Sequence, residues 1–196
     1  MMPPVTRALL IANVAVFLLQ SASGGLIEYW FALWPLGPRF QIWQVLTYGF
    51  LHGGLAHIFF NMFALYMFGS DVERLFGPRY FLTYYLVCVV SAAIFQLLVT
   101  GWIGAPGVPT IGASGAVYGL LLAFGMYFPR RMVMLIFPPI PMQARTFVIL
   151  FGALELVFGV TGTADGVAHF AHLGGMAGGW LVIQYRRRGF PFQNRR

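Results

Sequence analysis

Two segments of the sequence hold a serine and a histidine in settings that suit nucleophilic catalysis. Ser114 lies in a Gly-Ala-Ser-Gly string, and His172 follows Ala171 in a glycine-rich segment. A serine hydroxyl becomes a nucleophile only when a base takes its proton, and histidine is the usual base. The tetrahedral intermediate then needs hydrogen-bond donors aimed at its oxyanion. Ser114 and His172 are therefore the candidate nucleophile and base.

Three donors could serve that oxyanion. His57 and Asn61 are spaced i, i+4, so they share one face of a helix and both side chains could donate to one oxygen. Ser114 is expected to begin a helix, and its backbone N–H would be one of the N-terminal donors that lack an acceptor within the helix. Tyr118 is i+4 from Ser114 and is well placed to pack against an imidazole.

The composition requires these residues to sit in a membrane. The chain has 196 residues, of which 59% are hydrophobic and only 9% are charged, and its mean hydropathy is +0.77. Soluble domains are about 25% charged. The net charge of +7 comes from scattered arginines with no lysine, which excludes a nucleic-acid-binding face. The single cysteine, Cys88, excludes an intramolecular disulfide.

Apolar runs of about the length of a membrane span occur six times. We expect an all-α membrane protein with six transmembrane helices and one domain over residues 1–196. The helices are expected at about 8–23, 46–69, 79–100, 114–128, 146–161 and 168–185. The first run could instead be a signal peptide, because small residues follow it at 21–23.

The arginines predict the orientation of these helices. With six spans, all arginines except Arg39 fall on the side of the N-terminus. Positively charged loops favour the cytoplasm. Both termini are therefore predicted to be cytoplasmic. The aromatic loop 24–45 is expected to lie at the outer interface, and the Gly/Pro-rich loop 101–113 to enter the bilayer only against protein or a wet cavity.

Helix rise then gives the depth of the polar residues. Counted from the nearest inner charge at 1.5 Å per residue, Ser114 lies roughly 24 Å up, and His57 and His172 lie roughly 21 Å up. Three helices thus bring these groups to one level near the outer boundary. The only carboxylate expected near this level is Asp165 in the last outer loop, which favours a Ser-His dyad over a triad.

Other polar residues within the spans have more ordinary interpretations. His52 is expected to be a structural hydrogen bonder, His169 is an alternative base, and Glu155 is expected to pair with a buried donor. The i, i+4 glycine pairs that include Gly175 and Gly179 predict close packing of the last helix, with the helix at 114–128 as the expected neighbour.

Together these strings resemble the rhomboid family of intramembrane serine proteases. The matching patterns are His52-x4-His57-x3-Asn61, Gly112-x-Ser114-Gly115 with Tyr118, and Ala171-His172-x2-Gly175-x3-Gly179. The resemblance implies a basic six-helix bacterial core with Ser114 as nucleophile and His172 as general base. It also implies an oxyanion hole made by His57, Asn61 and the Ser114 backbone, with Tyr118 stacked on His172.

The resemblance further implies a location and partners. Substrates would be membrane-spanning protein segments cut near the outer face, and the protein would lie in a bacterial inner membrane. The helix at 146–161 and the last outer loop would gate entry. The Trp-Arg pair of the family's first loop is Trp43-Gln44 here. Nucleic acid, metals and cofactors are not expected.

Two alternatives come from other classes. An inactive relative could bind membrane helices as a chaperone, although such relatives usually lack the serine or the histidine. A metal-binding or transport protein could use the four histidines, His52, His57, His169 and His172. Their spacing permits ligands, but no carboxylate or cysteine is expected to complete the set at that depth.

Overall fold

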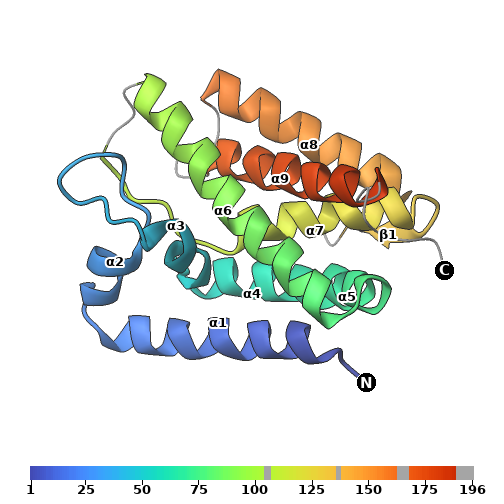
Figure 1. Cartoon of the computed structure of the whole chain (residues 1–196), viewed down its shortest axis with the longest axis horizontal. Helices are drawn as coiled ribbons and strands as arrows, with labels where there is room; N and C mark the ends of the chain where they lie inside the picture. Colours follow the sequence, from blue (N-terminus) through green and yellow to red (C-terminus); the bar gives the residue numbers. More distant parts are fainter. Residues whose placement is uncertain (104–106, 136–137, 163–167, 189–196) are drawn as a thin grey trace.

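The chain is mostly helical, with one short two-stranded sheet. The computed structural model describes residues 1–103, 107–135, 138–162 and 168–188 (Figure 1). The elements in chain order are α1 (Pro4–Ala22), α2 (Leu26–Phe31), α3 (Gln44–Thr47), η1 (Tyr48–Phe50), α4 (Leu55–Ala64), η2 (Leu65–Gly69), α5 (Ser70–Phe76), α6 (Pro78–Ile103), α7 (Ser114–Tyr127), β1 (Met132–Met134), β2 (Pro141–Gln143), α8 (Ala144–Thr161) and α9 (His169–Arg187).

The long helices have the length and composition of membrane spans. Within the described ranges, four are long and apolar enough to cross a bilayer, at Pro4–Ala22, Leu55–Phe76, Pro78–Trp102 and Ala144–Thr161. Ser114–Tyr127 is a shorter apolar helix. Large apolar side chains on α1, α4, α6 and α8 are exposed, among them Leu18, Phe59, Leu98 and Val160. The chain is therefore a helical multi-pass membrane protein.

The predicted helix at 46–69 is wrong at both ends. The chain leaves its helical path at Leu51, and the backbone is extended at Gly54 (φ 159°, ψ 174°), so the long helix starts only at Leu55. It then continues through η2, a π-helical turn, and α5 to Phe76. The residues after Gly69 remain helical, and several of their side chains are buried in packing.

Glu73 is the clearest example of that packing. Its carboxylate accepts hydrogen bonds from the backbone N–H groups of Val5 (2.9 Å) and Thr6 (2.6 Å) and from the Thr6 hydroxyl (2.7 Å). These are N-terminal donors of α1 that have no acceptor within the helix, in a region that favours negative charge. Glu73 on α5 therefore caps α1 from a different segment of the chain.

The other end of α1 is held by Gln20. Its amide donates to the His52 carbonyl (2.8 Å) and accepts from the His52 N–H (3.0 Å). Both hydrogen bonds between Gln20 and His52 are buried. Together with the Glu73 contacts, they fix the two ends of α1 against the segment that leads into α4 and against α5. The position of the loop that precedes α4 is fixed by the same pair of bonds.

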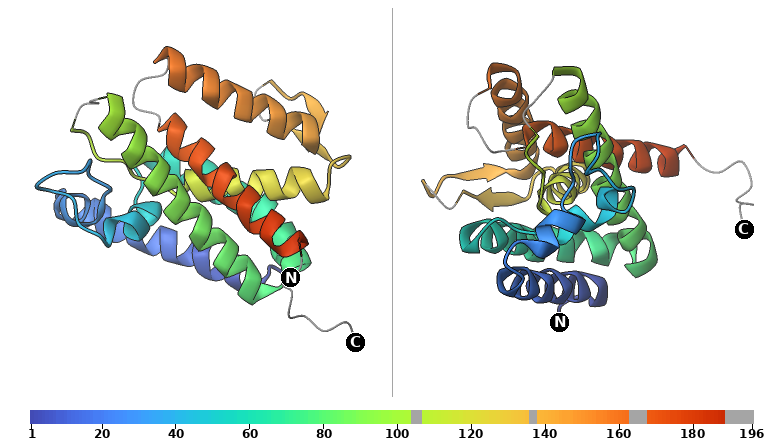
Figure 2. Two further views of the ribbon diagram at one scale, coloured as in Figure 1. Left: turned by 45° about the horizontal axis from the view of Figure 1, so that its top comes forward. Right: turned by 90° about the vertical axis from the view of Figure 1, so that its left-hand side faces the viewer.

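Glycines bring α9 close to two neighbours. Gly174, Gly178 and Gly179 face α6, where a Cβ would meet side chains of that helix. Gly175 faces α7, where a Cβ would collide with the backbone of Gly115. The expected approach to the helix at 114–128 thus occurs at Gly175, while Gly179 packs on α6. Figure 2 shows α9 crossing both helices at an angle.

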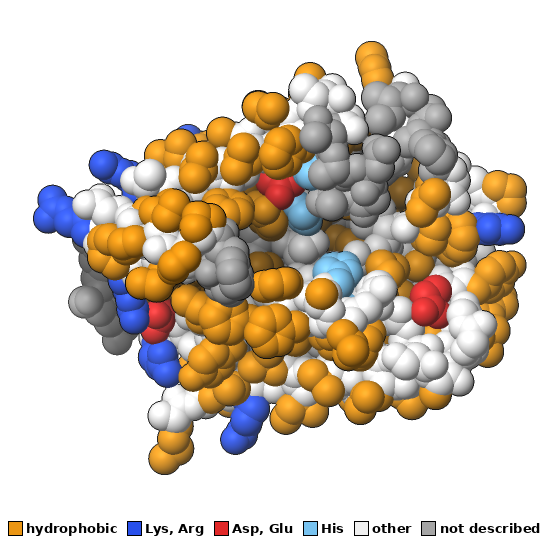
Figure 3. Space-filling view, turned by 180° about the vertical axis from the view of Figure 1, so that it is seen from behind, with side chains coloured by type: hydrophobic (Ala, Val, Ile, Leu, Met, Phe, Trp, Pro, Cys, Tyr) orange, Lys and Arg blue, Asp and Glu red, His pale blue; other side chains and the backbone are white. Residues whose placement is uncertain are grey.

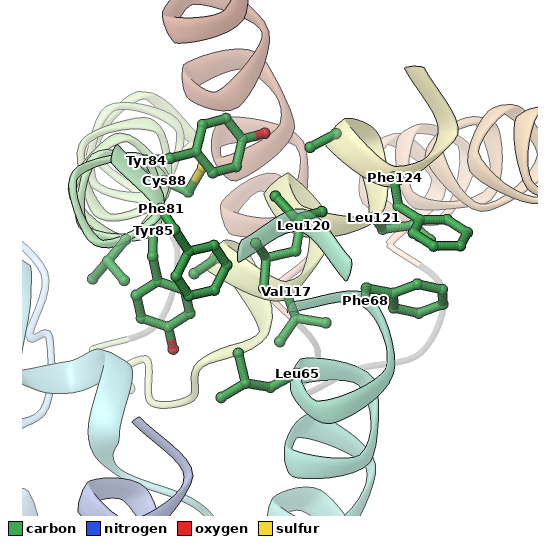
Figure 4. Packing of buried hydrophobic residues seen from close by; sticks show 14 of the residues in the cluster. Leu65, Phe68, Phe81, Tyr84, Tyr85, Cys88, Val117, Leu120, Leu121 and Phe124 are labelled. Atoms are coloured by element: carbon green, nitrogen blue, oxygen red, sulfur yellow. The ribbon is translucent and has the colours of Figure 1, made fainter. Parts of the chain in front are cut away.

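Large buried side chains surround α7. They come from η2 (Leu65, Phe68), α6 (Phe81, Tyr84, Tyr85) and α7 itself (Val117, Leu120, Leu121, Phe124), as Figure 4 shows. Because most of α7 is buried, the helix is held in place by its neighbours, and so is Ser114, its first residue.

Two connections differ in kind from the helices. The fold is not purely α-helical as predicted, because β1 and β2 pair antiparallel, with Val133 opposite Met142, between α7 and α8. Pairing satisfies the backbone N–H and C=O groups that a loop would leave without partners.

In the first loop Gln44 is fully buried. Its amide accepts from the N–H groups of Trp34 and Gln41 and donates to the carbonyls of Trp30 and Arg39.

The described arginines other than Arg39 lie at one end of the helices. That end holds the N-terminus and the last turn of α9 (Figures 1 and 3). They are Arg7, Arg74, Arg79, Arg130, Arg131, Arg145, Arg186, Arg187 and Arg188. Arg131 pairs with Asp71 (2.8 Å), which links the start of the β1–β2 connection to α5. Arg39 lies over the Trp34 ring in the loop at the opposite end.

Candidate active site

Ser114 and His172 lie within hydrogen-bond distance of each other. Ser114 is the first residue of α7, and His172 lies in the first turn of α9. The Ser114 Oγ is 2.8 Å from the His172 Nε2, and the histidine is only 7% exposed. The contact between Gly175 and Gly115 lies one turn further along α9, so it sets how closely the two helices approach at the serine and histidine.

Glycine is required just before the serine. Gly112 has φ +130°, and its N–H donates to the Tyr48 carbonyl (3.0 Å). A Cβ at this position would lie 2.8 Å from the His57 Nε2. The backbone of Gly112 therefore passes directly beside the His57 ring as the chain turns into α7, which no larger residue would permit.

The orientation of His57 leaves its Nε2 facing this turn. The Gly53 N–H donates to the His57 Nδ1 (3.2 Å). In a neutral imidazole, a nitrogen that accepts leaves the proton on the other one. The His57 Nε2–H is then a donor beside Gly112, two residues before Ser114. The Asn61 amide, one turn further along α4, donates to the His57 carbonyl (3.0 Å) and keeps a second N–H.

The ring of Tyr118 stacks on the ring of His172. Their centroids are 4.3 Å apart and their planes differ by 8°. The Tyr118 hydroxyl donates to the Glu155 Oε1. Tyr118 thus contacts the imidazole with its face and a carboxylate with its hydroxyl.

Glu155 on α8 lies against both histidines of α9. Its Oε2 is 2.6 Å from the His169 Nδ1 and 2.9 Å from the His172 Nδ1, and the residue is 7% exposed. The expectation that Glu155 pairs with a buried donor is confirmed. The expectation of no carboxylate at the level of Ser114 apart from Asp165 was wrong. Depth was counted along each helix as if all were parallel, whereas α8 and α9 are inclined (Figure 2) and a glutamate side chain is long.

Comparison with known proteins decides the family. The family model for the Rhomboid domain matches residues 39–189. The chain belongs to the rhomboid family. This confirms the resemblance that the three sequence patterns suggested, and the match includes every residue of the site described above.

Relatives of this rhomboid occur in bacteria and in a plant. Rhomboid protease GluP of Bacillus subtilis is 27% identical over 188 residues, which is 92% of this chain and 34% of GluP. Rhomboid protease GlpG of Klebsiella pneumoniae is 30% identical over 183 residues, which is 90% of this chain and 60% of GlpG. RHOMBOID-like protein 12, mitochondrial, of Arabidopsis thaliana is 30% identical over 164 residues, which is 76% of this chain and 48% of that protein. The chain thus spans between 34% and 60% of the length of these relatives.

The remaining histidines of this rhomboid are not placed as bases for Ser114. The His169 Nδ1 contacts Glu155, and its ring centroid is 6.4 Å from that of His172. His52 is 1% exposed and makes an edge contact with His57 at 5.1 Å. Within the described residues the His52 ring nitrogens have no hydrogen-bond partner. The hydrogen bonds between His52 and Gln20 are made by the His52 backbone. Asp165 lies outside the described residues.

The cluster of Glu155, His169 and His172 also has the residue types of a metal site. One ligand atom from each lies within 4.8 Å of the others, so a carboxylate does complete a histidine set, contrary to expectation. The two nitrogen–oxygen distances of 2.6 and 2.9 Å are those of direct contacts. Ligands around a tetrahedral zinc at about 2.0–2.1 Å lie roughly 3.3 Å apart. The side chains are therefore arranged to pair with one another. Figure 3 shows imidazoles next to an acidic side chain near the middle of a largely hydrophobic face.

Proposed function

We propose that this rhomboid is an intramembrane serine endopeptidase that uses Ser114 as nucleophile and His172 as general base. The observation that carries the proposal is the 2.8 Å contact between the Ser114 Oγ and the His172 Nε2 in a membrane protein of this family. The names of GluP and GlpG as rhomboid proteases point the same way.

The chemistry follows from the two side chains. His172 Nε2 takes the Ser114 hydroxyl proton as Oγ attacks the scissile carbonyl carbon, which gives a tetrahedral oxyanion. The imidazolium then gives that proton to the leaving amine, and an acyl ester on Ser114 remains. Water, deprotonated by the same ring, hydrolyses the ester and restores the serine. Tyr118 keeps the plane of the imidazole fixed through these transfers.

The oxyanion hole has three donors in this proposal. The backbone N–H of Ser114 is free of intrahelical acceptors because Ser114 begins α7. The His57 Nε2–H faces the turn before Ser114, and the second amide N–H of Asn61 lies on the same face of α4. Donors of this kind stabilise the charge that develops in the transition state.

Topology and substrate follow from the position of the site. His57, Ser114 and His172 each lie near the N-terminal end of a helix, away from the arginine-rich end. We propose six spans in a single domain with both termini cytoplasmic, in a bacterial inner membrane. The serine would then act near the outer face, on segments of proteins that span the same membrane.

The test is labelling with a fluorophosphonate probe in liposomes, together with cleavage of a membrane-spanning reporter peptide. The native chain should label and cleave, and Ser114→Ala and His172→Ala should do neither while they unfold at the native temperature. Asn61→Ala should lose on the order of 10²–10³ in turnover, as for one oxyanion donor in a soluble protease. Full activity in Ser114→Ala or His172→Ala, or no activity in well-folded native protein, would overturn the assignment.

A further inference from the structure

We propose that Glu155 is a positioning residue that turns the Ser114–His172 pair into a Ser-His-Glu triad. The inference rests on the proposed function and goes beyond the dyad that the sequence predicted. Its basis is the position of the carboxylate: the Glu155 Oε2 is 2.9 Å from the His172 Nδ1, on the side of the ring opposite Ser114.

The carboxylate selects the tautomer of His172. An ionised carboxylate can only accept hydrogen bonds, so the nearby Nδ1 must carry the ring proton. The His172 Nε2 is then the unprotonated nitrogen, and it is the one that faces the Ser114 hydroxyl. When Nε2 takes the serine proton, the ring becomes an imidazolium next to Glu155, whose negative charge stabilises it.

The His172 Nδ1 lies 2.9 Å from Oε2 but makes no hydrogen bond of standard geometry. Catalytic hydrogen bonds are often poorly aligned before substrate binds and tighten afterwards. The His172 ring is nearly parallel to the Tyr118 ring, so a small rotation in its own plane would align the pair and keep the stack.

Two further donors hold the carboxylate itself. The Tyr118 hydroxyl donates to Oε1, and the His169 Nδ1 lies 2.6 Å from Oε2. A buried charge is costly unless it is paired and hydrogen-bonded, and an ionisable residue inside a membrane helix indicates function. Glu155 therefore has one fixed orientation, and that orientation directs an oxygen to His172. Three helices contribute to the triad: α7, α8 and α9.

The experiment compares Glu155→Gln and Glu155→Asp with the native chain in liposomes, using reporter cleavage and fluorophosphonate labelling. The glutamine amide can donate to Nδ1, which would move the ring proton to Nε2 and block acceptance from serine. A carboxylate-to-amide exchange of this kind costs on the order of 10⁴ in kcat in a soluble serine protease. Glutamine can also turn its oxygen toward the rings, so we expect kcat to fall by about 10²–10⁴.

Several readouts separate this role from a merely structural one. KM should stay within about threefold, since the lost interaction acts on the chemical step. Glu155→Asp, which keeps the charge, should recover part of the lost kcat. Glu73→Gln is the matched control, because it makes the same exchange at a buried carboxylate far from Ser114. It should lower stability and leave kcat unchanged.

Nitrogen NMR of ¹⁵N-histidine-labelled native protein gives a test that needs no Glu155 variant. The His172 signals, assigned by their loss in His172→Ala, should be those of the Nδ1–H tautomer. An Nε2–H tautomer in native protein would overturn the proposal, as would kcat within threefold of native in both Glu155 variants.

Two other outcomes are distinguishable from these. Loss of native activity on chelation, with recovery on adding Zn²⁺, would overturn the triad in favour of a metal-binding cluster. If Ser114→Ala were as active as the native chain, the proposed function itself would fail, whatever the Glu155 variants did. If native activity depends on Ser114 but not on Glu155, the proposed protease function stands and only the proposed triad is refuted.

Discussion

Replacing Gly175 with alanine should separate the serine from its base. A Cβ at Gly175 would lie 2.6 Å from the carbonyl carbon and 3.2 Å from the Cα of Gly115. Carbon atoms in contact are about 3.5–4.0 Å apart, so α7 and α9 must move apart by roughly 1 Å. Backbone atoms of Gly115 cannot rotate away as a flexible side chain could.

That movement acts on the reacting atoms almost directly. Gly115 follows Ser114, and Gly175 is one turn from His172, so the 2.8 Å contact between Oγ and Nε2 would lengthen by a similar amount. At roughly 3.8 Å it would no longer be a hydrogen bond. A misplacement of about 1 Å costs on the order of 10²-fold in rate. Overpacking costs about 1–3 kcal/mol, and the better helix propensity of alanine returns up to about 1 kcal/mol.

The assay is the rate of fluorophosphonate labelling and of reporter cleavage, with thermal unfolding measured in the same detergent. Gly175→Ala should lose at least about 10² in both rates and at most about 3 kcal/mol in the free energy of unfolding. Gly152→Ala is the matched control, because its Cβ meets only the flexible end of Met176, at 3.2 Å. It should keep both rates within about threefold.

A folded Gly175→Ala protein that labels at the native rate would refute the reasoning. It would mean that α7 and α9 adapt without moving their side chains, so that the glycine contact does not set the distance between Ser114 and His172. Equal losses in Gly175→Ala and Gly152→Ala would also refute it, because the effect would then not depend on the backbone collision.

Two further predictions concern other parts of the scaffold. Gly112→Ala should reduce labelling at least about tenfold, because the residue has φ +130° and its Cβ would press on the His57 Nε2; labelling kinetics on folded protein would check this. Glu73→Gln should lower the free energy of unfolding by about 1–3 kcal/mol, because the amide weakens charge-assisted bonds to Val5 and Thr6; denaturant unfolding would measure it.

Periodicity and residue type were informative where each residue has one role. The patterns around His57, Ser114 and His172 identified the family, which the Rhomboid domain match confirms. Long apolar runs located the helices that became α1, α6, α7, α8 and α9, with ends within a few residues of those predicted. Glycines in α9 predicted close helix contacts, since no other residue lets two backbones approach so nearly.

The sequence was least informative where a polar residue is used by a distant segment. Glu73 lies just beyond the predicted end of the helix at 46–69, yet its carboxylate caps α1, nearly seventy residues away in the chain. Gln44 stands where the family has arginine, and only the structure shows how its amide joins four backbone groups of the first loop. Neither contact leaves a local periodic signal, because each depends on the tertiary position of two segments.

The contact of Glu155 with His172 was missed for a related reason, and it changes how the site is understood. A lone carboxylate in an apolar helix was a signal, but the depth count assigned it to a different level from His172. In the proposed triad, the contact of Gly175 with Gly115 sets the distance between Ser114 and His172, and Glu155 on α8 sets the orientation and tautomer of the His172 ring. Because α8 exposes a large apolar surface and lies outside the α7–α9 contact, a displacement of α8 would remove Glu155 from the base and leave the serine–histidine distance intact. Competence for proton transfer and proximity of the two groups are thus controlled by different helices.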